Sequence, residues 1–316
     1  MMIQALAIML SYYIDLIIGD PPKWPHPVKW FGRYIAFCER HFNKGRFKKL
    51  AGTMSLIMLL LLVFSSTVFL LLYLYRVHFL LGLVVEAGLI ATTIAQKGLD
   101  TAAKDVYKPL KEKKLKEARK KLSYIVGRDT ENLSEEEIVR STVETVAENT
   151  TDGITAPLFW AFIGGAPLAL VYRAINTCDS MVGYKTKELQ RFGWASARLD
   201  DIVNWIPARL TGVLMLFMKI PYGRSFMSAT QILLRDARKH NSPNSGWNEA
   251  AVAAVLGIQL GGINTYKGIQ SEAPLLGDKR VKLEANHIID TILIMKRVTL
   301  TFVIGGVLIV LTIARL

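Results

Sequence analysis

Residues 51–75 read AGTMSLIMLLLLVFSSTVFLLLYLY, a stretch without a single charged side chain. A transmembrane helix needs about 20 consecutive apolar residues, so this stretch is long enough to cross a bilayer. A second apolar run, residues 79–95, follows the short link Arg76-Val77-His78 and contains one charged residue, Glu86. The two runs are predicted to form a helical hairpin. Glu86 is a candidate buried acid of functional interest, but pairing with a neighbouring helix is the commoner explanation for such a residue.

Apolar segments recur along the chain, at residues 1–18, 154–175, 202–220 and 298–314. The 316 residues are 51% hydrophobic, with a mean hydropathy of +0.29, which is too apolar for an ordinary soluble domain of this length. These features predict an all-α fold, a multi-span helical integral membrane protein with polar cytoplasmic loops. We expect one membrane-embedded catalytic domain over residues 1–316.

Two of these segments contain helix-breaking or polar residues. Pro157 and the Gly164-Gly165-Ala166-Pro167 sequence interrupt residues 154–175, and Asn204, Pro207 and Arg209 lie in the first half of residues 202–220. Each segment is therefore either a tilted span or a broken, re-entrant helix. Broken helices at membrane depth are tolerated where they line a polar cavity.

The net charge is +13, and the basic residues flank the apolar runs. That distribution is typical of cytoplasmic loops and of contact with anionic lipid headgroups, so we expect a lipid membrane and not nucleic acid as the partner. The loop before residue 51 and the basic segment 96–149 are assigned to the cytoplasmic side. Residues 97–122 are compatible with a helix that lies near the membrane surface.

The cysteines indicate neither a disulfide framework nor a zinc site. Cys38 and Cys178 have no paired or metal-ligand spacing and are expected to be buried thiols. The N-terminal apolar run lacks a basic start and a small-residue cleavage site, which favours a retained membrane segment.

Ser134 and Glu137 match a capping box, so a helix is predicted to begin at Glu135. Continued toward Asp152, this helix places Glu144, Glu148 and Asp152 four residues apart. Like charges at this spacing repel. We therefore expect a cation, or a cationic group of a substrate, beside these carboxylates.

Polar residues concentrate in three clusters, at 148–152, 176–209 and 235–249. Carboxylates without cysteine favour magnesium over zinc, and arginines suit phosphate groups. Carboxylates, arginines and magnesium together are typical of sites that catalyse phosphoryl transfer. Neither a Walker P-loop, a Gly-x-Ser-x-Gly elbow nor a His-Glu-x-x-His motif occurs.

Several long motifs occur in order along the chain: GDP and PHPV within residues 19–28, ENTTDGITAP at 148–157, NTCDSMVGYK at 176–185, FGWASARLDD at 192–201, and RDARKHNSPNSGWNEA at 235–250. Together they resemble the adenosylcobinamide-phosphate synthases, the CobD/CbiB-type membrane enzymes of cobalamin biosynthesis. Cys178 departs from the aliphatic residue expected in the NTxD motif.

The resemblance implies an ATP-dependent ligase that joins adenosylcobyric acid, a corrinoid, to (R)-1-aminopropan-2-ol phosphate or a related aminoalcohol phosphate through an amide bond. It implies ATP and Mg²⁺, the cell membrane as location, and an active site that faces the cytoplasm. The sequence leaves open which aminoalcohol phosphate is preferred and whether the chain forms a homo-oligomer.

Candidate site residues are taken from the polar clusters and the motifs. The catalytic candidates are Asp152, Asp179, Asp201, Arg198, His240 and His26, the histidines because imidazole titrates near neutral pH. The substrate-binding candidates are Asn149, Lys185, Asn204, Arg209, Arg238, Asn244, Ser245 and Glu249. The candidate magnesium ligands are Asp152, Asp179, Asp200, Asp201 and Glu249.

Two other functions are compatible with intramembrane charges and broken helices: a membrane transporter and a non-catalytic membrane protein of the same fold. The apolar segments show no repeated halves, which argues against the first, and the intact Asp and Arg motifs argue against the second.

Overall fold

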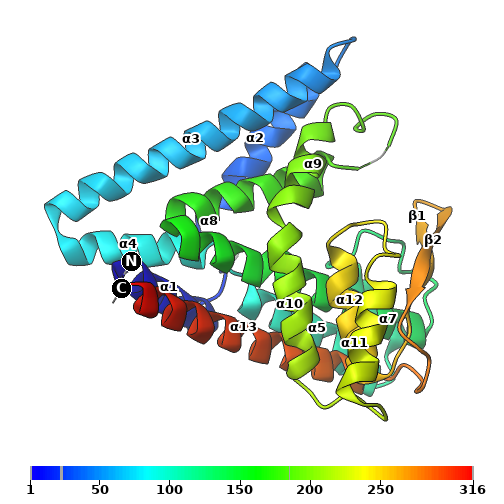
Figure 1. Cartoon of the computed structure of the whole chain (residues 1–316). Coiled ribbons are helices and arrows are strands. Elements are labelled where there is room, and N and C mark those ends of the chain that lie inside the picture. Colours follow the sequence, from blue (N-terminus) through cyan, green and yellow to red (C-terminus); the bar gives the residue numbers. More distant parts are fainter. Residues whose placement is uncertain (1, 22–23, 185, 315–316) are drawn as a thin grey trace. The chain divides into compact units, whose positions relative to one another are not determined.

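The computed structural model describes residues 2–21, 24–184 and 186–314, and its elements are mainly helices (Figure 1). In chain order they are α1 (Met2–Ile17), α2 (Pro27–Phe42), α3 (Lys48–Val77), α4 (Phe79–Ala91), α5 (Gln96–Lys111), α6 (Leu115–Leu122), α7 (Glu135–Thr150), the π-helix η1 (Thr151–Thr155), α8 (Ala156–Val182), α9 (Trp194–Val203), α10 (Trp205–Phe217), α11 (Phe226–Asp236), α12 (Ser245–Leu256), β1 (Leu260–Tyr266), β2 (Ile269–Leu276) and α13 (Asn286–Ile313).

The chain folds into two compact units. Unit 1 comprises the described residues of 1–97, 152–204 and 302–316, and unit 2 comprises residues 98–151 and 205–301. By length and composition, four helical stretches of the described chain are apolar enough to cross a membrane: Lys48–Val77, Phe79–Lys111, Glu135–Val182 and Asn286–Ile313. The prediction of a multi-span helical membrane protein is confirmed.

In unit 1 the predicted helical hairpin is formed by α3 and α4, which turn back on each other at His78 (Figure 1). The Nδ1 atom of His78 accepts from the Leu80 N–H at 3.2 Å and so caps α4. A core of α2, α3 and α8 side chains encloses both cysteines, which are free and buried as expected.

The α8 segment reverses direction at Gly164-Gly165, so the re-entrant alternative describes its fold. Gly165 has φ 64° and ψ −156°, a conformation that a residue with a Cβ rarely adopts. On the far side of the turn Arg173 Nη1 donates to the Asp152 carbonyl at 3.2 Å. In a straight helix these two residues would lie about 30 Å apart. The two arms of α8 are therefore antiparallel (Figure 1).

The carboxylate of Glu86 on α4 holds this reversal. It accepts from the Tyr75 hydroxyl at 2.5 Å and from the Ala166 N–H, the start of the second arm, at 3.4 Å. The predicted pairing of Glu86 with a neighbouring helix is confirmed.

Replacing Glu86 by alanine is expected to lower the free energy of unfolding by about 1 to 3 kcal/mol, because it leaves the Tyr75 hydroxyl and the Ala166 N–H buried without an acceptor. Thermal unfolding in detergent measures the effect. Glu86→Gln keeps one acceptor oxygen and should lose less. A Glu86→Ala variant as stable as the wild type would contradict this role.

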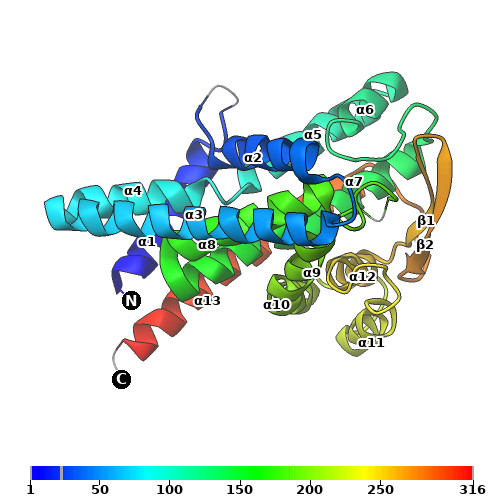
Figure 2. The same ribbon diagram turned by 90° about the horizontal axis from the view of Figure 1, so that it is seen from above.

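In unit 2 the helix α12 is central, and every residue of it except Trp247 is buried. It packs against α7, α10 and α11 (Figure 2) and ends at Gly257, whose φ of 70° provides a left-handed cap. The predicted capping box is present at the start of α7: Ser134 accepts from the Glu137 N–H, and the Glu137 carboxylate accepts from the Ser134 N–H at 2.7 Å.

The structure has three features that the sequence pattern did not predict. Residues 97–122 form two helices, because Lys113, at φ 57°, breaks the segment between α5 and α6. Residues 260–276 form an antiparallel hairpin that turns at Lys267-Gly268, both with positive φ. Helix α13 starts at Asn286 and not at Val298, because its polar first turns bury Ile288, Ile292 and Met295 at helical spacing.

Candidate functional site

The polar cluster of unit 1 forms where η1 and the second arm of α8 meet α9. The Tyr172 hydroxyl donates to Asn204 Oδ1 at 2.8 Å and to the Asp152 carbonyl at 3.3 Å. Asn176 Nδ2 lies 3.5 Å from Asp152 Oδ2 and 3.4 Å from Asp200 Oδ1. The reversal of α8 thus brings together residues from three motifs that are separated in the sequence.

Asp200 is the most buried carboxylate of this cluster, with an exposed fraction of 9%. Its Oδ2 atom accepts from Asn204 Nδ2 at 3.0 Å. Burial, together with the negative charge of Asp179, raises the pKa of Asp200 to about 7, although hydrogen bonds from Asn204 and Asn176 oppose the shift. At neutral pH this carboxyl group therefore exchanges its proton readily.

The raised pKa predicts a stability that falls as the pH rises. Between the ordinary value of 3.8 and about 7 the folded protein holds a proton on Asp200 that the unfolded chain has lost. Stability from this group is thus greatest at acidic pH and decreases until the pH passes about 7, by on the order of 4 kcal/mol. Asp200→Asn should flatten the decrease between pH 5 and pH 8 in thermal unfolding. An unchanged slope would contradict the burial of an ionisable Asp200.

Asp179 and Asp201 lie at the edge of the same cluster, and both are half-buried. The negative charges of both carboxylates raise the pKa of Asp200. Gly183 leaves no room for a Cβ, because the Asp179 carboxylate lies against its α-carbon. Arg198 is exposed on α9.

Magnesium fits this cluster. Among the described residues, three or more His, Cys, Asp or Glu side chains nowhere gather closely enough to hold a metal by themselves. Magnesium is commonly bound by one or two carboxylates and completes its shell with water and phosphate oxygens. Asp152 and Asp200, which share Asn176, supply such a pair.

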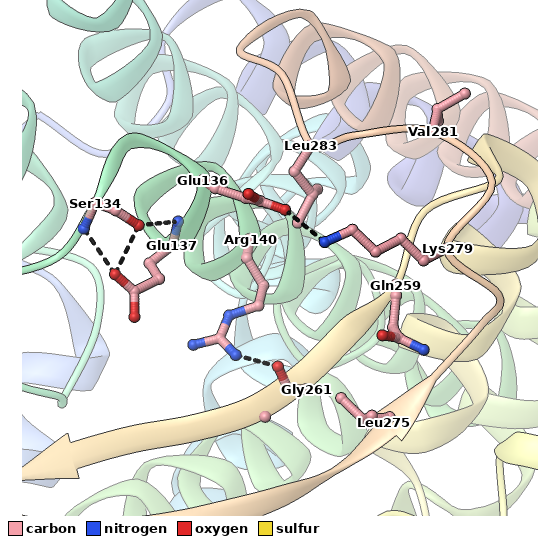
Figure 3. A pocket seen from close by; sticks show the side chains of 11 residues that line it. Ser134, Glu136, Glu137, Arg140, Gln259, Gly261, Leu275, Lys279, Val281 and Leu283 are labelled. Atoms are coloured by element: carbon pink, nitrogen blue, oxygen red, sulfur yellow. Dashed lines mark hydrogen bonds and ion pairs between the residues drawn. The ribbon is translucent and has the colours of Figure 1, made fainter.

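In unit 2 the Glu144 carboxylate of α7 pairs with arginines of the chain itself. Arg128 Nη1 donates to Glu144 Oε2 at 2.8 Å and to Asn264 Oδ1 at 2.8 Å. Arg140 donates to the Gly261 carbonyl, as Figure 3 shows, and to Asn264 Oδ1 at 3.0 Å. The cation expected beside Glu144 is therefore Arg128, and the network fastens the hairpin to α7.

The start of α12 carries a second group of polar side chains. Ser245 Oγ donates to Glu148 Oε1 at 2.8 Å, and His240 Nε2 lies 3.6 Å from Glu249 Oε1. Burial, with the charges of Glu144 and Glu148, raises the pKa of Glu249 well above its usual value. The absence of a side chain at Gly246 lets His240 lie close to the start of α12, because a Cβ at this position would overlap the Ala237 carbonyl and the Cβ of His240.

Arg209 is held between two tryptophan rings. Its Cζ atom lies 4.1 Å from the centre of the Trp205 ring and 5.1 Å from that of Trp247. Nη1 donates to the Trp205 carbonyl at 2.6 Å and to Asn244 Oδ1 at 3.3 Å. The guanidinium is thus fixed in one plane, with the positive charge of Arg238 nearby. Such a fork suits a phosphate or a carboxylate.

The remaining predicted residues have other surroundings. His26 caps α2, since its Nδ1 accepts from the Val28 N–H at 3.3 Å, and its Nε2 lies 3.1 Å from Asp20 Oδ1. Asn149 Nδ2 donates to the Thr145 carbonyl of its own helix at 2.9 Å. Arg238 is exposed, and Lys185 lies outside the described residues.

Sequence reasoning missed Tyr172, Arg173 and Trp205, which complete the two clusters. A signal existed for Arg173, because a charged residue inside an apolar segment is itself a marker of function. Tyr172 and Trp205 carried no comparable signal, since aromatic residues are ordinary members of apolar helices.

Comparison with known proteins places these clusters in a family context. Residues 8–295 match the family model described as CobD/Cbib protein. The chain is 51% identical over 306 residues to the cobalamin biosynthesis protein CobD of Halalkalibacterium halodurans, an alignment that covers 95% of each chain. It is 45% identical to CbiB of Salmonella arizonae, over 92% of each chain, and 46% identical to CobD of Clostridium perfringens, over 90% of this chain and 91% of that one. No solved structure matches.

Proposed function

The chain belongs to the CobD/CbiB family, and from this membership we propose that it acts in cobalamin biosynthesis as an adenosylcobinamide-phosphate synthase. It joins the free carboxylate of adenosylcobyric acid to the amine of (R)-1-aminopropan-2-ol phosphate, or of a related aminoalcohol phosphate. The observation that carries the proposal is the cluster of Asp152, Asn176 and Asp200, which unites three family-like motifs in one polar group.

A carboxylate does not form an amide with an amine at neutral pH unless it is activated. In the proposed reaction a carboxylate oxygen of the corrinoid attacks the γ-phosphorus of ATP, and ADP leaves. The amine nitrogen of the second substrate then attacks the acyl carbon. Inorganic phosphate leaves with the former carboxylate oxygen, and the nitrogen loses a proton.

The residues of unit 1 are assigned to the phosphoryl-transfer step. Asp152 and Asp200 would hold Mg²⁺, with Asp179 and Asp201 beside them, and Arg173 and Arg198 would supply positive charge. When bound, the ion stabilises negative charge on phosphate oxygens. Asn176 keeps the two carboxylates oriented through its amide, which lies within 3.5 Å of each of them.

The residues of unit 2 are assigned to the aminoalcohol phosphate. Arg209 and Arg238 bind its phosphate, and Asn244 and Ser245 at the start of α12 orient it. His240 takes the proton that the amine loses, and Glu249, whose Oε1 lies 3.6 Å from His240 Nε2, keeps the imidazole in position.

We place the protein in the cell membrane, with the active site facing the cytoplasm, where ATP is available. The four apolar helical stretches support a membrane location. The basic loops around them support the orientation.

A reaction in nanodiscs tests the proposal. Purified protein supplied with adenosylcobyric acid, aminopropanol phosphate and ATP-Mg²⁺ should form adenosylcobinamide phosphate, identified by its mass, and omission of any one component should abolish the product. Uptake of corrinoid into proteoliposomes without chemical change would instead favour a transporter.

A further inference from the structure

The end of α10, the loop that follows it and the first turn of α11 present large apolar side chains to the surroundings. Ile220 is 85% exposed, Met227 69%, Phe217 62% and Tyr222 57%. Soluble surfaces rarely gather so many large apolar side chains within eleven residues, and such patches mark sites of protein or membrane contact.

The loop is nevertheless held in place. Arg297 Nη1 donates to the Met218 carbonyl at 2.7 Å, and Arg280 Nη1 donates to the Gly223 carbonyl at 2.5 Å. The Tyr222 N–H donates to the Val255 carbonyl at 2.8 Å. The exposed side chains are thus displayed on a fixed backbone.

Contacts with α13 show at which level of the membrane the loop lies. Arg297 directly precedes the apolar run 298–314, and Thr301 Oγ1 lies 3.7 Å from Met218 Sδ. Basic residues that border the apolar run of a membrane helix lie at the level of the lipid headgroups. The loop beside Arg297 therefore lies at the boundary between the hydrocarbon layer and the headgroups.

The exposed face of α10 also supports a position of the loop at this boundary. Ile206, Leu210, Val213 and Phe217 are exposed at spacings of four, three and four residues, which form one stripe along the helix. The helix has 13 residues and is about 20 Å long, which is too short to cross a hydrocarbon layer of about 30 Å. Its apolar stripe ends in the loop.

We propose that residues 217–227 form an interfacial anchor that inserts into the headgroup region of an anionic bilayer. Ile220, Phe217 and Met227 enter the apolar side of the interface, and the Tyr222 ring lies at headgroup level. Arg280 and Arg297 are exposed and bonded only to backbone carbonyls among the described residues, so they keep a net positive charge for lipid phosphates. The anchor does not depend on the proposed reaction.

Fluorescence of a label at position 220 tests the anchor in the full chain. Ile220→Cys is labelled with an environment-sensitive fluorophore in nanodiscs of phosphatidylcholine with phosphatidylglycerol; the two native thiols are buried. Glu131→Cys, at an exposed polar position of the same unit, provides the water reference. Because Ile220 is 85% exposed, its replacement should not disturb folding.

The label at 220 should be quenched several-fold more than the label at 131 by a lipid with a nitroxide near the headgroup, and several-fold less by iodide. The difference should shrink in pure phosphatidylcholine. Equal iodide quenching at the two positions would overturn the anchor. Equal lipid quenching at 220 in both bilayers would overturn its assignment to anionic headgroups.

Discussion

Replacing Asp152 by asparagine is expected to lower kcat for amide formation by about 10²- to 10³-fold, the loss seen when one electrostatic group of an active site is removed. The substitution removes a charge but preserves shape, and the amide can still hydrogen-bond to Asn176, whose Nδ2 lies 3.5 Å from Asp152 Oδ2. Tyr172 and Arg173 donate to the backbone carbonyl of residue 152, so the substitution retains these two hydrogen bonds. Turnover, followed by mass spectrometry of the corrinoid product, measures the loss.

The matched control is Asp105→Asn, which removes a carboxylate that pairs with Lys121 on the surface of unit 2. This variant should keep wild-type turnover. If Asp152→Asn reacts as fast as Asp105→Asn, while both fold and insert normally, Asp152 has no part in the chemistry.

Replacing Arg209 by alanine is expected to raise KM for the aminoalcohol phosphate by about 10- to 100-fold, because a charged hydrogen bond contributes about 1.5 to 3 kcal/mol. Arg209→Lys keeps the charge but loses the planar fork and the stacking between Trp205 and Trp247. The lysine variant should recover only part of the affinity. Initial rates at varied aminoalcohol phosphate, with corrinoid and ATP saturating, give both values.

Arg76→Ala serves as the control, since Arg76 is an exposed arginine at the end of α3. It should leave KM unchanged. A normal KM in Arg209→Ala would exclude Arg209 from the phosphate site, and an equal rise in KM for ATP would assign it to the nucleotide instead.

The sequence predicted those elements whose signals are local. A long run without charged residues predicts α3. The capping box of Ser134 and Glu137 predicts the start of α7, and Gly164-Gly165 with Pro167 predicts the break in α8. The reversal of the chain after that break depends on the contact between Arg173 and the Asp152 carbonyl. These residues are distant in the sequence, so no local pattern predicts the reversal. The hairpin of β1 and β2 was missed because its anchors, Arg128 and Arg140, lie on a different part of the chain.

The candidate site was predictable as a set of residue types but not as an arrangement. The repulsion among carboxylates on α7 indicated a nearby cation, and Arg128 meets Glu144 there. Nothing local distinguishes such a structural partner from a ligand. Likewise, Asp200 and Asn204 are four residues apart, a spacing that places two side chains on one face of a helix, whereas the burial that raises the pKa of Asp200 depends on packing.

Isotope transfer tests the central claim, amide formation through phosphoryl activation of the corrinoid carboxylate, most directly. Adenosylcobyric acid labelled with ¹⁸O in its free carboxylate is converted with aminopropanol phosphate and ATP-Mg²⁺, and the products are analysed by mass spectrometry. We predict one amide formed per phosphate released and one ¹⁸O atom in that inorganic phosphate. Product without ¹⁸O in phosphate would contradict the activation step, and the absence of any amide product from folded protein would contradict the proposed synthase.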